Sequence, residues 1–258
     1  MNNSGILNIN VMEQFPHLSK APITEAVVEI RARGSVQWKE TEILNKLKLK
    51  LPEYPSYRSG RAFEVQLKPE QEQKVASKDL GWQGLQFKSS DERHIAKFQQ
   101  DLFSFSRLHP YGNWEQFTGE ALRLWSIHFE LSKHLEIQRL GVRFINRFTF
   151  SEKRIKLEDY FRAFPDDLAA MNLIRIGFIH HDTFAIPGNL YAMNVIKTVQ
   201  PSDEPDNEPA LILDIDTYTL QPFEPKVELI KQRLDEIHHL KNKAFFGIIT
   251  KELTERYI

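Results

Sequence analysis

The chain repeats one order of hydrophobic patterns, and this order limits the folds open to it more than any other feature. Between residues 26 and 33, apolar side chains alternate with charged ones, which is typical of a strand with one buried face. Apolar residues at helical spacing follow at 39–50, and Pro52 ends that helix. A long amphipathic helix is predicted at 114–133. The short strands predicted between the two helices are 63–67, 84–87, 93–99 and 102–108.

The same order then starts again. A strand is predicted at 136–150 and a short helix at 156–164. A closing helix is predicted over 225–257, with Pro225 in its first turn. The strands predicted between these helices are 172–184, 189–199 and 210–219. The residues in helical register along the closing helix are Val227, Ile230, Leu234, Ile237, Lys241, Phe245 and Ile248.

These patterns predict an α+β fold in which helices pack on an antiparallel sheet. We expect an irregular N-terminal arm over residues 1–20 and two similar halves, 21–134 and 135–258. Each half would contain a strand, a helix, an antiparallel meander and a second helix. Because only a few residues separate the halves, we expect one pseudo-twofold unit rather than two independent domains.

Composition removes several classes of function. The 258 residues include no cysteine, so thiol nucleophiles, disulfides and cysteine-based metal sites are excluded. The net charge of −1 gives no general attraction to nucleic acid or to an anionic membrane. No signal peptide and no long apolar run is recognised in the sequence, so we expect a cytoplasmic protein without a membrane span.

Arginines recur on one face of the strand predicted at 136–150. Arg139, Arg143 and Arg147 are four residues apart, so neighbouring guanidinium groups start about 13 Å from each other along the strand. Guanidinium groups bind phosphates and carboxylates, and Gly141 would leave room for a ligand or a neighbouring backbone. The alternative is pairing with carboxylates of adjacent strands, such as Glu29. The further candidate anion-binding residues are Arg31 and Arg175.

Two aspartates share a face of the strand predicted at 210–219. Asp214 and Asp216 lie about 7 Å apart along the strand, which is close enough to share a divalent cation. Glu29 would be a third oxygen ligand if the charged strand faces line one cavity. The alternative is pairing of the aspartates with Arg175 or Lys197.

Histidine pairs and aromatic residues have simpler interpretations. The neighbouring pairs at 180–181 and 238–239 point in different directions on a strand or a helix, so neither pair can chelate one ion. Aromatic residues between 103 and 125 could stack on single-stranded nucleic acid, but their spacing favours core packing. Nucleic acid is therefore not a favoured partner.

Three segments resemble an uncharacterised, sporadically distributed family of prokaryotic proteins of about this length. The segments are Phe15-Pro16-His17-Leu18 with the run from Ala21 to Ile30, the run from Phe103 to Tyr111 with Trp114 and Phe117, and the run from Arg139 to Arg147. The resemblance implies a bacterial or archaeal protein. Its patchy distribution is typical of mobile elements, toxin–antitoxin loci and defence systems. It assigns no catalytic residue.

We therefore expect a non-enzymatic binding or interaction protein, an accessory component of such a locus. A protein partner is expected, and a second copy of the chain is a further candidate partner. The alternative is an enzyme that handles phosphate esters or nucleotides with the arginine row and the aspartate pair.

Overall fold

The computed structural model describes residues 6–66, 76–150, 157–162, 177–188, 190–200 and 210–258. Within these ranges the chain forms an α+β fold with one nine-stranded antiparallel sheet. The strand order is β2-β3-β4-β5-β1-β6-β9-β8-β7, so the first strand of each predicted half lies at the centre of the sheet. None of the helices in the described ranges has an apolar stretch long enough to cross a membrane.

The elements up to residue 132 largely follow the predicted order. They are β1 (Ile23–Arg33), α1 (Glu40–Lys50), β2 (Ser56–Gln66), β3 (Ala76–Lys88), β4 (His94–Gln99), β5 (Leu102–Leu108) and α2 (Trp114–Ser132). Asn113 caps α2, since its side chain accepts a hydrogen bond from the Gln116 amide at 2.8 Å.

The later elements are β6 (Glu136–Thr149), α3 (Leu157–Tyr160), β7 (Ile179–Ala185), β8 (Tyr191–Gln200), β9 (Ala210–Thr219), α4 (Val227–Ile248) and α5 (Lys251–Glu255). The predicted helix over 225–257 is wrong at two points. It begins after Lys226, so Pro225 precedes the helix. It also breaks at Ile249, whose backbone is extended. The Thr250 side chain then caps the separate helix α5 by accepting a hydrogen bond from the Leu253 amide.

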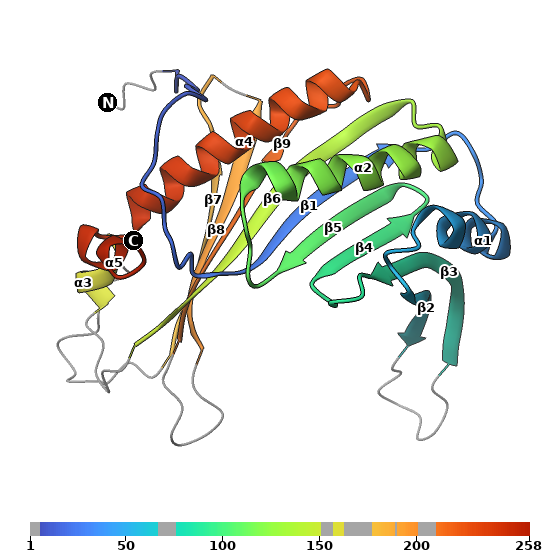
Figure 1. Cartoon of the computed structure of the whole chain (residues 1–258), viewed down its shortest axis with the longest axis horizontal. Coiled ribbons are helices and arrows are strands. Elements are labelled where there is room, and N and C mark those ends of the chain that lie inside the picture. The colour runs from blue at the N-terminus through green and yellow to red at the C-terminus, as the bar shows by residue number, and fades with distance from the viewer. Residues whose placement is uncertain (1–5, 67–75, 151–156, 163–176, 189, 201–209) are drawn as a thin grey trace.

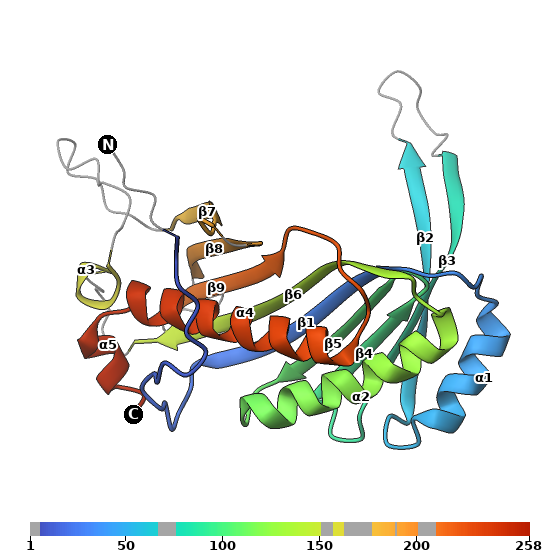
Figure 2. The same cartoon turned by 90° about the horizontal axis from the view of Figure 1, so that it is seen from above.

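Helices α2 and α4 cover one face of the sheet, and none of the helices in the described ranges lies on the other, helix-free face (Figure 2). The core lies between these helices and the strands. Along β6, the buried side chains of Leu140, Val142, Phe144 and Phe148 face this core. The alternate residues therefore lie on the helix-free face, as the period of two predicts. Figure 2 also shows that the β2–β3 hairpin extends well beyond the helix-free face.

The β2–β3 hairpin is longer than the predicted strands at 63–67 and 84–87. Its register shifts twice, between Gly60 and Arg61 and between Ala62 and Phe63. Shifts of this kind interrupt the alternation of apolar and polar residues on which strand prediction depends. The hairpin is held by its ladder of backbone hydrogen bonds, and the chain opposite Gly60 continues through another glycine, Gly84.

Candidate functional site

The arginines and carboxylates predicted from the sequence meet on the helix-free face. Arg139 Nη1 lies 3.1 Å from Glu29 Oε1, and its Nη2 lies 2.7 Å from Asp216 Oδ2. Arg31 Nε also donates to Glu29, at 2.9 Å. The Arg139 guanidinium lies 4.3 Å from the centre of the Tyr218 ring. These groups form a continuous ion-pair chain across β1, β6 and β9.

A second ion pair lies beside this chain. Arg143 Nε donates to both carboxylate oxygens of Asp214, at 2.8 and 3.0 Å, and its Nη2 also bonds to Asp214. The Asp214 side chain is 8% exposed, whereas Arg143 is half exposed. Asp214 raises the pKa of Arg143 above its ordinary value. Burial raises the pKa of Asp216, although Arg139 acts in the opposite direction.

Gly141 does not leave the open space that the sequence suggested. A β-carbon at this position would lie 2.6 Å from Arg139 Nη1, so the guanidinium of Arg139 already fills that space. Two further candidates, Arg147 and Lys197, take no part in the ion pairs described above. Arg147 is exposed and makes no ion pair with the described part of the chain, and Lys197 lies opposite Leu213, on the other face from Asp214. Arg175 lies outside the described residues.

The ion pairs determine what this face can do chemically. Both aspartates bind guanidinium groups, so a metal cation bound to the aspartates would have to displace these guanidinium groups. Among the described residues, no three His, Asp or Glu side chains come together in a way that could hold a metal ion. The observed pairing matches the alternative in which the arginines bind carboxylates of neighbouring strands.

Removing Arg143 tests this structural role. We expect Arg143→Met to lower the free energy of unfolding by about 1–3 kcal/mol, because it leaves the carboxylate of Asp214 buried without its partner. The free energy of unfolding, measured in urea, should fall less in the double variant Arg143→Met/Asp214→Leu than the sum of its losses in the two single variants. Strictly additive losses would show that the two side chains are not coupled.

A separate cavity lies on the helix-bearing face, between α4 and the N-terminal arm. Figure 1 shows the arm, in dark blue, crossing α4 before it enters β1. Glu13 of the arm binds Lys243 of α4, at 2.9 Å. The Phe15 ring stacks on Phe246, with 5.7 Å between ring centres. These contacts hold the arm against the helix and enclose the space beneath it.

We call this space the arm cavity. It has a volume of 660 Å³, within the range of about 300–1,000 Å³ typical of small-molecule sites. Its walls come from the arm and the first residue of β1, from the segment that leads into α2 and the start of α2, from β6 and from α4. The residues that line it are Val11–Ile23 except Ser19 and Lys20, together with Tyr111–Glu115, Asn146, Asp235, His238, His239, Lys241, Asn242, Phe245 and Phe246.

Lys241 is the most unusual residue of the arm cavity. This residue is only 7% exposed, and it makes no hydrogen bond or ion pair with any described residue. Its Nζ lies 3.9 Å from the centre of the Phe144 ring, whose face attracts the ammonium group. Burial lowers the pKa of Lys241 to about 7.

Tyr111 provides a second unsatisfied polar group in the same place. Its ring packs edge-to-face on Phe144, with 5.3 Å between ring centres. Its hydroxyl is buried and has no hydrogen-bond partner among the described residues. Burial, assisted by Glu115, raises the pKa of Tyr111, so the hydroxyl stays protonated. Lys241 and Tyr111 therefore present two donors around one aromatic ring.

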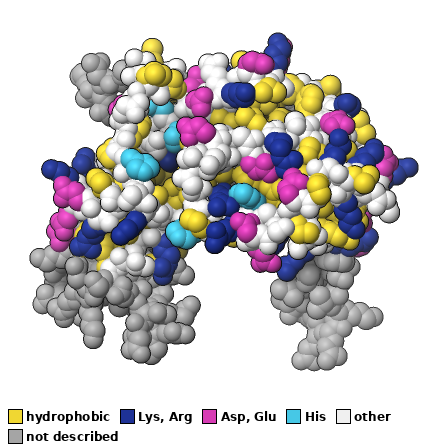
Figure 3. Space-filling model, viewed as in Figure 1, with side chains coloured by type: hydrophobic (Ala, Val, Ile, Leu, Met, Phe, Trp, Pro, Cys, Tyr) yellow, Lys and Arg dark blue, Asp and Glu magenta, His cyan; other side chains and the backbone are white. Residues whose placement is uncertain are grey.

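The two histidines of α4 complete the wall. His238 stacks on Trp114 at 4.1 Å, and burial lowers its pKa to about 3, with Lys241 adding to the effect. The His238 ring is therefore uncharged at neutral pH. Among the described residues, neither ring nitrogen of His239 has a hydrogen-bond partner, although Nε2 lies 3.5 Å from Glu13 Oε2. Burial also lowers the pKa of His239. Figure 3 shows several histidines on this helix-bearing face, among interspersed acidic and basic side chains.

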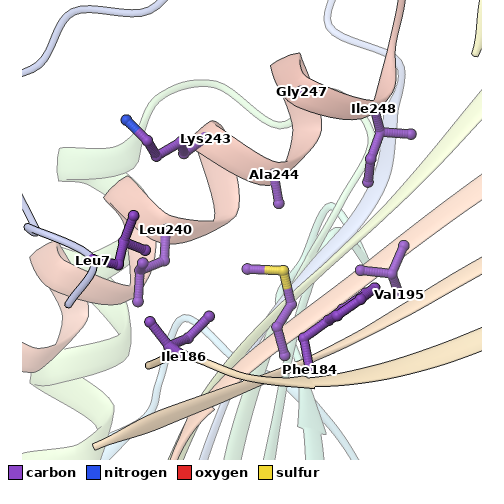
Figure 4. Close-up of a pocket in the computed structure, with 10 residues that line it drawn as sticks. Leu7, Phe184, Ile186, Val195, Leu240, Lys243, Ala244, Gly247 and Ile248 are labelled. Atoms are coloured by element: carbon purple, nitrogen blue, oxygen red, sulfur yellow. The ribbon is translucent and has the colours of Figure 1, made fainter. Parts of the chain in front are cut away.

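Another cavity, of 360 Å³, lies on the opposite side of α4. Figure 4 shows apolar side chains of α4, such as Leu240 and Ala244, opposite Phe184 and Ile186 of the β7–β8 region. The nitrogen of Lys243 points away from this space (Figure 4). Without a polar group turned inward it offers no specific recognition, so the arm cavity is the candidate functional site.

Sequence reasoning missed Lys241, Tyr111 and the α4 histidines as a site, although one signal was present. Lys241 occupies a core position in the apolar register of the closing helix, where a charged side chain is costly. Comparison with protein-family models, with curated protein sequences and with solved structures finds no match for the chain.

Proposed function

We propose that the protein is a non-enzymatic binding protein that holds a small organic ligand in the arm cavity. The observation that carries this proposal is the ammonium group of Lys241, which is buried without an ionic or hydrogen-bonding partner in the described structure. A buried charge without a partner costs stability, and such groups concentrate at functional sites. The unsatisfied hydroxyl of Tyr111 points to the same conclusion.

The segments that resemble the prokaryotic family support this choice of site. Phe15 and Leu18 come from the first segment, Tyr111 from the second and Asn146 from the third, and all four line the arm cavity. Asn146 Nδ2 donates to the Leu213 carbonyl at 3.0 Å, which fixes this side chain at the cavity wall. An accessory role in a mobile-element, toxin–antitoxin or defence locus, with a protein partner, stays a prediction.

The pseudo-twofold relation between residues 21–134 and 135–258 belongs to the same proposal. Its support is the order of the strands, in which β1 and β6 are antiparallel neighbours and each meander continues outward from them. Tyr111 belongs to the first half and Lys241 to the second. On this view the ligand binds where the two halves and the arm meet.

The enzyme alternative has less support. It needs the arginine row and the aspartate pair to be available for phosphate or metal. Arg143 instead binds Asp214 through several hydrogen bonds, and Arg139 bridges Glu29 and Asp216.

A ligand screen tests the proposed function. We expect some members of a panel of neutral, cationic and anionic aromatic compounds to raise the melting temperature of the wild-type protein. Tyr111→Phe should weaken binding of these compounds about ten-fold, because it removes one donor. Lys231→Met is the matched control, since Lys231 is exposed on the same helix and outside the cavity. Equal responses of wild type and Tyr111→Phe to every compound would contradict the proposal.

A further inference from the structure

The charges around the arm cavity restrict what can bind in it. Among the described residues that line it, Lys241 is the only Lys or Arg. Three carboxylates, those of Glu13, Glu115 and Asp235, lie in the same wall. Two of them already have partners, because Glu13 binds Lys243 and Asp235 accepts a hydrogen bond from Trp114 Nε1 at 3.1 Å. One cation among three carboxylates can compensate a ligand that carries a single negative charge.

The two unsatisfied groups are both donors. The ammonium of Lys241 has no acceptor capacity, and the hydroxyl of Tyr111 is held protonated by its surroundings. The ammonium group lies over the Phe144 ring, and the Tyr111 ring packs edge-to-face on the same ring. A carboxylate has two oxygens with which to accept from both donors, and its hydrogen bond to an ammonium is charge-assisted.

The rest of the cavity is suited to an apolar body. Phe15, Phe245 and Phe246 lie along the arm and α4, and the stacked rings of Trp114 and His238 lie toward α2. Rings of this kind bury flat or branched hydrocarbon without requiring further polar contacts.

We propose that the arm cavity selects monocarboxylates with an apolar, preferably aromatic, body, and that Lys241 Nζ and Tyr111 Oη bind the carboxylate. This inference rests on the proposed function and adds the chemical class of the ligand. A phosphate ester, with its second negative charge, would face the three carboxylates without a second cation. A neutral amide would leave the ammonium of Lys241 without a counter-charge.

Binding of a carboxylate in the arm cavity is expected to change the protonation of Lys241. With a pKa of about 7, Lys241 is mostly neutral at pH 8 in the empty cavity. A bound carboxylate favours the charged form, so the ligand and a proton bind together. We expect clear proton uptake at pH 8 and little at pH 6. The other titratable groups that line the cavity are Glu13, His17, Tyr111, Glu115, Asp235, His238 and His239.

Calorimetry with three matched probes tests the inference: 3-phenylpropanoate, its amide, and phenyl phosphate. At pH 6 we expect the carboxylate to bind the full-length protein at least ten-fold more tightly than either comparator. At pH 8, its binding enthalpy in buffers of different ionisation enthalpy should show proton uptake. Lys241→Met should lose both the preference for the carboxylate at pH 6 and the proton uptake at pH 8. The control Lys231→Met should keep both.

The outcomes separate the inference from the proposed function. Equal or tighter binding of the amide or the phosphate overturns the carboxylate assignment and leaves a binding cavity in place. Carboxylate binding without proton uptake at pH 8, or binding that survives in Lys241→Met, also overturns it. Borohydride trapping of an aldehyde analogue on Lys241 would assign the lysine a covalent role instead. Failure of every compound in the wider panel overturns the inference and the proposed function together.

Discussion

Replacing Lys241 with methionine is expected to stabilise the protein. Methionine keeps the buried stem of the side chain and removes the ammonium group, whose burial lowers its pKa from 10.5 to about 7. We expect the free energy of unfolding to rise by about 2–4 kcal/mol at pH 6, since a desolvated charge without a partner is removed. Urea unfolding of wild type and variant measures this difference.

The stability that Lys241→Met gains over the wild type should decrease as the pH rises. Below pH 7, Lys241 is charged in both the folded and the unfolded protein, so the whole cost of burying the charge is present. Between pH 7 and about 10.5, the unfolded chain binds a proton that the folded chain does not, and the wild-type free energy of unfolding therefore rises with pH. The advantage of Lys241→Met should shrink to under about 1 kcal/mol near pH 10.

The control is Lys231→Met, which should change stability by less than about 0.5 kcal/mol because Lys231 is exposed. A loss of stability in Lys241→Met at pH 6 would mean that the ammonium has a favourable partner in the folded protein. A gain in stability combined with a loss of ligand binding would show that the chain retains a destabilising residue for function, as binding sites commonly do.

The second large effect is expected at Gly84, where the base of the β2–β3 hairpin meets β4. Its φ of +133° lies in a region that L side chains rarely adopt, and a β-carbon there would lie 2.3 Å from the Phe98 carbonyl oxygen. That atom belongs to the backbone and cannot rotate away. We expect Gly84→Ala to lower the free energy of unfolding by about 3–5 kcal/mol.

Gly119→Ala is the matched control for this substitution. Gly119 is exposed within α2, and a β-carbon there meets nothing within 4 Å. Because alanine favours the helix, this variant should be more stable by about 0.5–1 kcal/mol. Similar effects of the two substitutions on the urea midpoint would contradict the backbone argument for Gly84.

The strands with one buried face were predictable from their residues. Val28 and Ile30 alternate with Glu29 and Arg31, and this pattern placed β1 correctly to within a few residues of its ends. The β2–β3 hairpin was not predictable to its full length, because its bulges and exposed faces remove that alternation. The break after α4 was missed because Ile249 continues the apolar register while its backbone is extended.

The ion pairs on the helix-free face were partly predictable. The spacing of Arg139 and Arg143 placed both on one face of β6, opposite carboxylates. Their exact partners depended on the register of β6 with β1 and β9, which no local pattern encodes.

The arm cavity was not predictable in this way, because its walls come from distant segments. Lys241 stood out only as a charge in an apolar register. Its lack of a partner became visible once Tyr111, Phe144 and the arm were placed around it.

The contact between the arm and α4 also has a consequence for synthesis of the chain. Glu13 and Lys243 are 230 residues apart, so the arm leaves the ribosome long before its partner helix exists. Throughout that interval Phe15 lacks the Phe246 ring on which it finally stacks. The arm cavity therefore cannot form until α4, which supplies one of its walls, has emerged from the ribosome.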